Sequence, residues 1–243
     1  MQLYTLREMA AKDLPRTLAA VARAGYKEVE FAGYHGHPAP SIRSMLDDNG
    51  LVATASHVSI DDLARVGEVV MEDAVTLGQK YVAVAWIDAK DRTEEGYRRI
   101  AQRFNEFGLL ARGENLTFAY HNHAYEFAPL AGGRSGYEIL LDEVDPLNLV
   151  LEADVFWMQR AQQDPLAWFA RYPGRFHMMH LKDMGTPPKK EMLDVGSGTT
   201  NWPAVIAAGK RAGVKHFFVE HDEPKDPVAS ITSSYRYLRS LKT

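Results

Sequence analysis

RFHMMHLKD, residues 175–183, is the stretch that decides the fold. The apolar part, Phe176–Leu181, is too short for a helix and is soon followed by a glycine and two prolines, so it predicts one buried strand. Its far end carries His180, Lys182 and Asp183, which are groups that bind metal ions or move protons. The stretch therefore predicts a buried strand that delivers reactive side chains at its carboxyl end.

Three other apolar runs finish in the same way, with His, Asp or Glu as their last residues. They are LTFAYHNH (Leu116–His123), LNLVLEAD (Leu147–Asp154) and HFFVEHD (His216–Asp222). In a parallel barrel the carboxyl ends of the strands meet at one rim, where the active site is built. The four runs together predict a barrel whose functional site lies at that rim.

Strand-like and helix-like segments alternate over the whole chain. The other predicted strands are Gln2–Arg7, Val29–Gly33, Leu51–Val58 and Tyr81–Trp86. Eight strands alternating with eight helices predict an α/β fold, a single (β/α)8 TIM barrel covering residues 1–243, because strand–helix–strand units all curl with the same hand. A doubly wound open sheet is the alternative, but no glycine-rich phosphate loop follows the first strand.

A repeated corner supports this count of strands. AGYKEVEF, LGQKYVAV and AGVKHFFV each place a glycine before one residue, a lysine and a strand. These glycines are Gly25, Gly78 and Gly213. Each is predicted to take the left-handed conformation that ends a helix, so the three segments are the same helix-to-strand corner.

The composition narrows the classes of function. The chain has 243 residues, the length of one α/β barrel, and a formal net charge of -4 that disfavours nucleic acid and anionic membranes as partners. The absence of cysteine excludes disulfides, thiolate catalysis and Cys-ligated metal. No apolar run approaches the length of a membrane span. The first residues look like a strand, so the expected compartment is the cytoplasm, although a removed export leader would leave the same start.

The side chains at the predicted rim form a set of metal donors. They are Asp154, His180 and Glu220, with one donor from the end of the fifth predicted strand, namely Glu126, His121 or His123. Oxygen and nitrogen ligands without sulfur suit Mn²⁺, Mg²⁺, Co²⁺ or Zn²⁺. Such an ion can polarise a carbonyl and hold two substrate oxygens. The alternative is that these are ordinary polar residues at strand ends, which is less convincing for four successive strands than for one.

The motifs HLKD, ADVFW, YHNHAYEF and FVEHD resemble the sugar phosphate isomerase/epimerase family. These are xylose-isomerase-like TIM barrels that include the inosose dehydratases and ketose 3-epimerases. The likeness runs from QLYTLR to the last helix, and its motifs are specific to the superfamily but weak on substrate. It implies a divalent-metal-dependent sugar isomerase or epimerase with a small carbohydrate substrate. Such barrels are usually homodimers or homotetramers.

The resemblance also implies a ligand set. Family members bind one divalent ion through a Glu, an Asp, a His and a second Glu from strands five to eight. By resemblance, Asp154, His180 and Glu220 take the last three places. The fifth strand has HNH where ketose epimerases have Glu. We favour Glu126 over these two histidines for the first place, because an oxygen-rich set suits Mn²⁺ or Mg²⁺ better than Co²⁺ or Zn²⁺.

The implied chemistry is proton abstraction next to a carbonyl through a metal-bound enediolate. Glu126 and Glu220 are the predicted acid/base pair, and Lys182 and His123 complete the predicted catalytic set. Lys182 would direct its charge to a substrate oxygen. Its alternative is a surface lysine paired with Asp183.

The predicted substrate contacts come from the ends of strands three, four, five and seven. They are His57, Trp86, His121, His123 and Lys182. Trp86 offers an apolar wall for a sugar face, although a core position is equally typical of tryptophan. The two strand-five histidines have the same parity and point the same way. Glu30, inside the second predicted strand, needs a buried partner and either bonds across the barrel floor or faces the site.

Three other functions compete with the isomerase. A dehydratase or lyase acting on a keto-sugar, keto-glycoside or inosose shares the first step and then expels a β-oxygen. A DNA-repair endonuclease shares this barrel, but it needs three metals and a basic groove. A non-catalytic sugar-binding module would bind without turnover. The long irregular segment Gly185–Thr200 predicts a mobile cover over the site.

Overall fold

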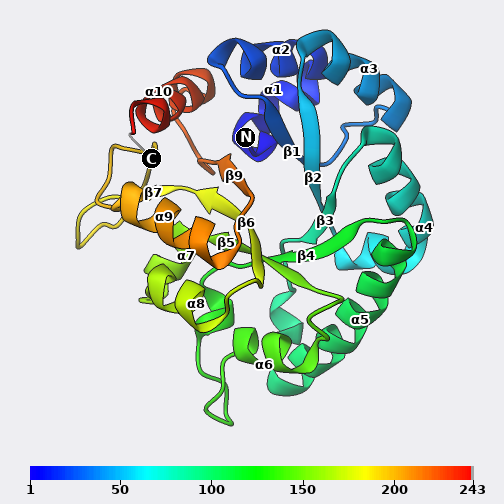
Figure 1. Ribbon diagram of the computed structural model, residues 1–243, viewed down its shortest axis with the longest axis vertical. Coiled ribbons are helices and arrows are strands. Elements are labelled where there is room, and N and C mark those ends of the chain that lie inside the picture. The colour runs from blue at the N-terminus through cyan, green and yellow to red at the C-terminus, as the bar shows by residue number, and fades with distance from the viewer. Residues whose placement is uncertain (242–243) are drawn as a thin grey trace.

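Seven parallel strands form one sheet that curls into a barrel. The computed structural model describes residues 1–241, so residues 242 and 243 of the predicted domain lie outside the described residues. The sheet order is β1-β2-β3-β4-β5-β6-β9, and each neighbouring pair is parallel. The strands are β1 (Glu28–Ala32), β2 (Val52–Val58), β3 (Tyr81–Val84), β4 (Thr117–His121), β5 (Val150–Asp154), β6 (Phe176–Leu181) and β9 (His216–Val219). The predicted TIM barrel is confirmed (Figure 1).

The predicted first strand, Gln2–Arg7, is wrong in all but its first residue. Gln2 makes a single parallel bridge to Glu30, and its backbone N–H donates to the carbonyl of Val219 on β9 (3.0 Å). The chain then turns into a 3-10 helix, η1 (Leu3–Leu6), because the Gln2 side chain accepts the N–H of Tyr4. One residue therefore fills the gap between β9 and β1 that a full eighth strand would occupy.

Helices form a ring outside the strands (Figure 1). They are α1 (Arg7–Lys12), α2 (Leu14–Ala24), α3 (Ala39–Asn49), α4 (Ile60–Leu77), α5 (Glu94–Gly113), α6 (Gly136–Glu143), α7 (Val155–Arg160), α8 (Pro165–Arg171), α9 (Trp202–Ala212) and α10 (Pro227–Ser240). Short 3-10 turns also follow β3 and β4, as η2 (Ala89–Asp91) and η3 (Tyr125–Phe127). The three corner glycines end α2, α4 and α9 with φ angles of 109°, 71° and 108°, which confirms the repeated corner.

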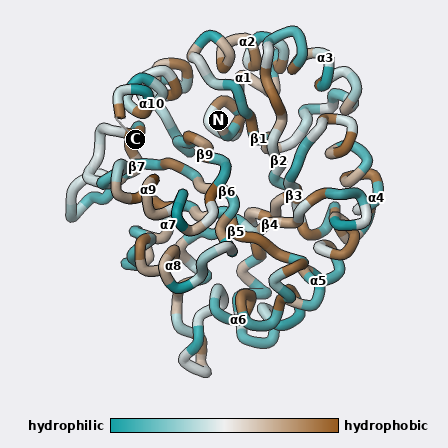
Figure 2. Tube along the Cα trace, viewed as in Figure 1, coloured by the Kyte–Doolittle hydropathy of each residue, from teal (hydrophilic) through white to brown (hydrophobic). Residues whose placement is uncertain are grey.

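Alternate residues of the strands face two different environments. On β4, Phe118 and Tyr120 pack outward against Phe104 of α5. Ala119, between them, belongs to a small apolar layer that fills the barrel interior with Ala55, Tyr81, Ala83, Val150, Met178 and Phe218. The hydrophobic colour of the strands in Figure 2 reflects burial on both faces. This parity decides which side chains reach the site.

The predicted irregular segment Gly185–Thr200 contains some regular structure. A two-residue strand, β8 (Met192–Leu193), pairs antiparallel with β7 (Asp183–Met184). Asp183 is fully buried and holds both ends of the segment. It accepts the N–H of Met184, Gly196 and Thr200 and the indole N–H of Trp202 at 2.8–3.1 Å. The Asp183 carboxylate therefore accepts hydrogen bonds from the loop and from Trp202, and it does not pair with Lys182.

Candidate functional site

The site is built from side chains that stand two residues beyond the interior apolar layer. His57 follows Ala55 on β2, His121 follows Ala119 on β4, and His180 follows Met178 on β6. Glu152 and Glu220 follow Val150 and Phe218 in the same way. Because side chains of a strand alternate between faces, these positions all point into the barrel at its carboxyl end. Distant parts of the sequence therefore meet at one place.

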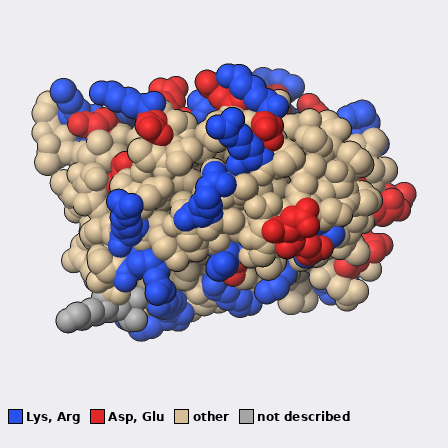
Figure 3. Space-filling model, turned by 90° about the horizontal axis from the view of Figure 1, so that it is seen from above, with Lys and Arg blue, Asp and Glu red and all other residues tan. Residues whose placement is uncertain are grey.

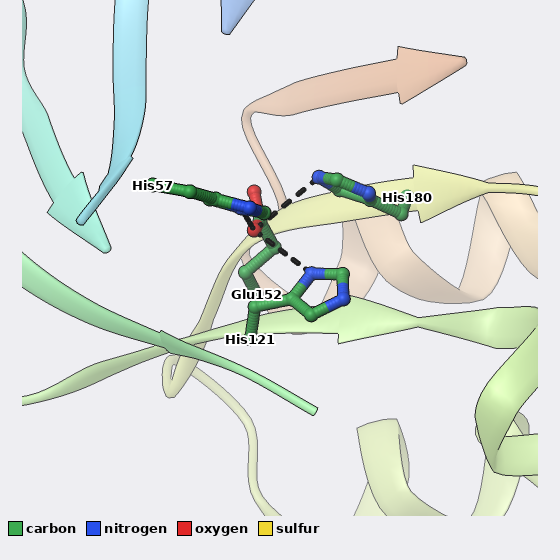
Figure 4. A group of neighbouring side chains, drawn as sticks. All are labelled: His57, His121, Glu152 and His180. Carbon is green, nitrogen blue, oxygen red and sulfur yellow. Dashed lines mark hydrogen bonds and ion pairs between the residues drawn. The ribbon is translucent and has the colours of Figure 1, made fainter. Parts of the chain in front are cut away.

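One group of these side chains, here called the histidine set, is His57, His121, Glu152 and His180. Figure 4 shows three imidazoles turned toward one carboxylate. Glu152 Oε2 lies 2.8 Å from His57 Nε2, 3.0 Å from His121 Nδ1 and 3.3 Å from His180 Nε2. Glu30 adds a further oxygen, with Oε2 at 2.7 Å from His180 Nε2 and 3.2 Å from His57 Nε2.

A second group, the carboxylate set, is Asp154, His180 and Glu220. His180 belongs to both sets, and its Nδ1 lies 2.7 Å from Glu220 Oε2. Lys182 is also part of this region, with only 2% of its side chain exposed. Its Nζ lies 2.7 Å from Glu220 Oε2, 2.8 Å from Asp222 Oδ1 and 3.1 Å from Asp154 Oδ2. The surface-lysine alternative is therefore wrong.

The electrostatics follow from burial and from the carboxylates. Burial opposes protonation of His180, but Glu152, Glu30 and Glu220 raise its pKa well above the ordinary value. Burial also opposes the charge of Lys182, yet Asp154, Glu220 and Asp222 hold its pKa well above normal. Burial raises the pKa of Asp154 to about 6. The region is thus an assembly of opposite charges removed from water, which is typical of functional sites.

A cavity of about 360 Å³ opens beside these residues. Its walls include all five predicted substrate contacts: His57, Trp86, His121, His123 and Lys182. Glu220 lines the same cavity. Trp86 is 54% exposed, so it is a wall and not core, and its ring meets His123 edge-to-face at 5.4 Å. Burial, and then the charge of Lys182, lowers the pKa of His123 to about 3, so this imidazole is neutral.

The structure does not bring Glu126 to the other predicted ligands. Glu126 lies in η3, fully buried, where it accepts the hydroxyl of Tyr120 (2.6 Å) and the backbone N–H of His123 (2.9 and 3.0 Å). Tyr120 has the outward parity on β4, so it draws this carboxyl away from the barrel interior. Glu126 belongs to neither group of possible metal donors, and His121 occupies the strand-five position of the histidine set.

Two carboxylates in the site were not predicted as ligands. Glu152 lies two residues before Asp154 in LNLVLEAD, so strand parity alone places both on the inward face. For Glu30, the sequence predicts only a buried carboxylate that needs a partner. In the structure this side chain faces the site. Two carboxylate oxygens here, Glu30 Oε1 and Glu152 Oε1, are buried without a hydrogen-bond partner. Unsatisfied buried oxygens beside imidazoles fit a bound cation.

The fold and the site together define a class of protein: a parallel α/β barrel with possible metal ligands at the carboxyl ends of its strands. Residues 18–241 match the family described as "Xylose isomerase-like TIM barrel". The chain belongs to this family. A stretch of 94 residues is 30% identical to an inosose dehydratase from Clostridium tetani, and it spans 38% of this chain and 30% of that protein.

Solved structures share the fold over the whole chain. A sugar phosphate isomerase/epimerase from Parabacteroides distasonis has a TM-score of 0.87 at 24% identity, covering 100% of this chain and 93% of the other. The IOLI protein, solved with a bound zinc atom, has a TM-score of 0.75 at 16% identity and covers 98% and 95%. At these identities the likeness concerns the fold.

Basic and acidic side chains both occur on the face drawn in Figure 3. Among residues 1–241, none of the helices combines the length and the apolar character that spanning a membrane requires.

Proposed function

We propose that this protein is a divalent-metal-dependent enzyme that removes a proton from the carbon next to a carbonyl of a sugar or cyclitol. Isomerisation or epimerisation is the reaction class that we put first. The observation that carries the proposal is the gathering of four buried carboxylates, two buried imidazoles, the half-buried His57 and one buried ammonium beside a cavity of about 360 Å³. The carboxylates outnumber the ammonium, and with the imidazoles neutral, as metal ligands must be, a divalent cation would offset their remaining negative charge.

Either donor set offers ligands to such an ion: the carboxylate set that the sequence predicted, or the histidine set. When bound, the ion would polarise the substrate carbonyl and stabilise negative charge on its oxygen. The partnerless oxygens of Glu30 and Glu152 support a cation here. The reaction class does not depend on which set holds it.

Glu220 is the proposed base. It lines the cavity, and although burial opposes ionisation, Lys182 and then His180 hold its pKa well below normal, so it is a carboxylate. Asp154, Glu220 and Asp222 raise the pKa of Lys182, so its ammonium can donate hydrogen bonds to a substrate oxygen. His123, neutral and beside the same cavity, has a buried Nδ1 without a partner that a substrate hydroxyl can satisfy. Trp86 supplies the apolar wall for a sugar ring.

Dehydration or lyase chemistry is the second candidate. The match to an inosose dehydratase favours it, and so does the position of Lys182, whose ammonium can donate a hydrogen bond to an oxygen that leaves from the β-carbon. Both reactions begin with the same proton removal. They differ in the next step: the carbanion is either reprotonated or expels the oxygen bound to the β-carbon.

The test is solvent deuterium exchange on a panel of ketohexoses, ketopentoses, an inosose and a 3-keto-glucoside. We expect deuterium at the carbon next to the carbonyl, lost after chelation and restored by Mn²⁺, Co²⁺ or Zn²⁺. Glu220→Gln should slow the exchange by at least about a hundredfold, whereas the exposed Glu114→Gln should not change it. A mass-neutral product indicates an isomerase or epimerase, and loss of water or of an aglycone indicates the second candidate. Exchange that is absent from every substrate, or indifferent to Glu220→Gln, would contradict the proposal.

A further inference from the structure

The histidine set and the carboxylate set share one residue, His180, as a possible metal ligand. His180 turns Nε2 toward the histidine set and Nδ1 toward Glu220 of the carboxylate set. A neutral imidazole has one lone pair for a metal and one N–H to donate. Only one set can therefore receive the lone pair of His180 while the other receives its N–H.

The carboxylate set already has a cation. Lys182 Nζ contacts Glu220 Oε2 and Asp154 Oδ2 at 2.7 and 3.1 Å, the same two atoms that would bind a metal there. A divalent ion bound by these oxygens would lie next to a buried ammonium and be repelled by it. Among the described residues, no lysine or arginine pairs with Glu152 or Glu30.

The imidazoles of the histidine set are oriented as metal ligands usually are. A ligating histidine commonly gives its other N–H to a carboxylate, which fixes the ring and its tautomer. With Nε2 of His180 on the metal, its Nδ1 is 2.7 Å from Glu220. With Nδ1 of His121 on the metal, its Nε2 faces Asp154 Oδ2 at 3.6 Å. Both carboxylates then act through histidines while Lys182 balances their charge.

The spacing of the histidine set also suits a small cation. Ligand atoms around a tetrahedral ion at zinc-like bond lengths are about 3.4 Å apart. Glu152 Oε2 lies 2.8–3.3 Å from the three imidazole nitrogens, so a slight expansion makes room. The second oxygen of Glu152 and one oxygen of Glu30 are buried and partnerless, which is an independent sign of an absent positive partner.

We infer that the resident divalent ion is held by His57, His121, Glu152 and His180, with Glu30 as an additional oxygen donor, and that Asp154 and Glu220 orient two of these histidines. This inference rests on the proposed function for the presence of an ion, and it changes the ligands and the metal class. Three imidazoles with carboxylates suit Zn²⁺, Co²⁺ or a similar transition ion and do not suit Mg²⁺.

X-ray absorption of the protein loaded with Zn²⁺, and separately with Co²⁺, distinguishes the two sets. The histidine set places three imidazoles on the metal and the carboxylate set only one. We expect three in the wild type, two in His57→Gln and three in Glu220→Gln, because Glu220 is not a ligand. We also expect His57→Gln to weaken Zn²⁺ binding by at least about a hundredfold, as measured by competition with a chromophoric chelator. Mg²⁺ in large excess should not displace the bound Zn²⁺.

His37→Gln, in the loop after β1, is the matched control and should leave both the affinity and the imidazole count unchanged. Thermal unfolding of the metal-free variants checks that each one folds, and the wild-type spectrum needs no variant at all. A count of one imidazole, with affinity unaffected by His57→Gln, would place the ion in the carboxylate set and overturn the inference. Failure to bind any divalent ion would also overturn it. Deuterium exchange that persists without metal would then show that proton abstraction survives on its own.

Discussion

Two regions of this molecule bury carboxylates, and they treat them in opposite ways. Inside the barrel, Asp154 and Glu220 lie against Lys182 and His180. Behind β4, Glu126 has hydroxyl and backbone N–H donors but no cation within ion-pair distance among the described residues. Burial opposes ionisation in both regions. In the interior, Lys182 and His180 hold the pKa of Glu220 well below normal and that of Asp154 rises only to about 6, whereas the pKa of Glu126 rises to about 7.

The difference arises because the two faces of one strand, β4, meet different surroundings. Tyr120 and His121 are neighbours in sequence but point to opposite faces of β4. His121 joins the metal donors, and Tyr120 holds Glu126 in the helix layer. Glu126 in turn binds the backbone of His123 and so fixes the turn that carries a predicted substrate contact.

The largest expected effect on the interior charges is that of Lys182→Met, which keeps an unbranched side chain of similar size and removes its charge. Asp154, Glu220 and Asp222 would lose their common partner, and we expect about 3–5 kcal/mol less stability at neutral pH. Denaturant unfolding of the chelator-treated protein measures this change. The exposed Lys215→Met is the control and should cost little. A loss below about 1 kcal/mol would mean that the carboxylates do not depend on this ammonium.

Glu126→Gln tests the opposite region through pH. The folded pKa of about 7 lies above the ordinary value of 4.5. Between these values the folded protein keeps a proton that the unfolded chain has released, so stability falls as pH rises through this window and is level above it. Glu126→Gln has no proton to release, so its stability does not fall in this window. We expect the stability difference between the variant and the wild type to shift in favour of the variant by up to roughly 3 kcal/mol from pH 4 to pH 8.

Unfolding free energies at both ends of this pH range, with Glu114→Gln as the exposed control, measure the effect of Glu126. Equal pH slopes for wild type and Glu126→Gln would show that folding does not raise the pKa of Glu126.

The smallest expected effect is that of Tyr120→Phe, which sharpens the comparison by removing one donor to Glu126. The lost hydrogen bond of 2.6 Å should cost about 1–2 kcal/mol, and more above pH 7, where the carboxylate needs the donor. Tyr97→Phe is a matched control, because the Tyr97 hydroxyl is buried without a partner and its removal should cost nothing. If both variants cost the same, the Tyr120 hydroxyl does not stabilise Glu126.

Much of the fold was predictable because barrel strands carry strong local signals. Seven of the eight predicted strands form, since each is an apolar run bounded by helix caps or turn residues. Gln2–Arg7 failed because its apolar residues suit a helical turn equally well, and only the bond from Gln2 to Tyr4 N decides between them. The hairpin in the segment after β6 has no sequence signal, because two-residue strands depend on contacts with Asp183.

The site was predicted in part. The inward parity of His121, Asp154, His180 and Glu220 could be read from the strands, and these side chains do converge. The two donor sets share His180, so together they hold one ion at a time, whereas a nuclease would need three. The net charge still disfavours a nucleic-acid partner.

The sequence by itself determined the alternation of strands and helices, the reactive residues at the strand ends and the likeness to one family, because these depend on local periodicity and chemistry. Only the tertiary structure decided that Glu126 turns outward, that Glu30 and Glu152 join the histidines, and that Lys182 lies between three carboxylates. Those outcomes depend on which side chains from distant strands reach each other across the barrel. Such distances arise only when the sheet closes.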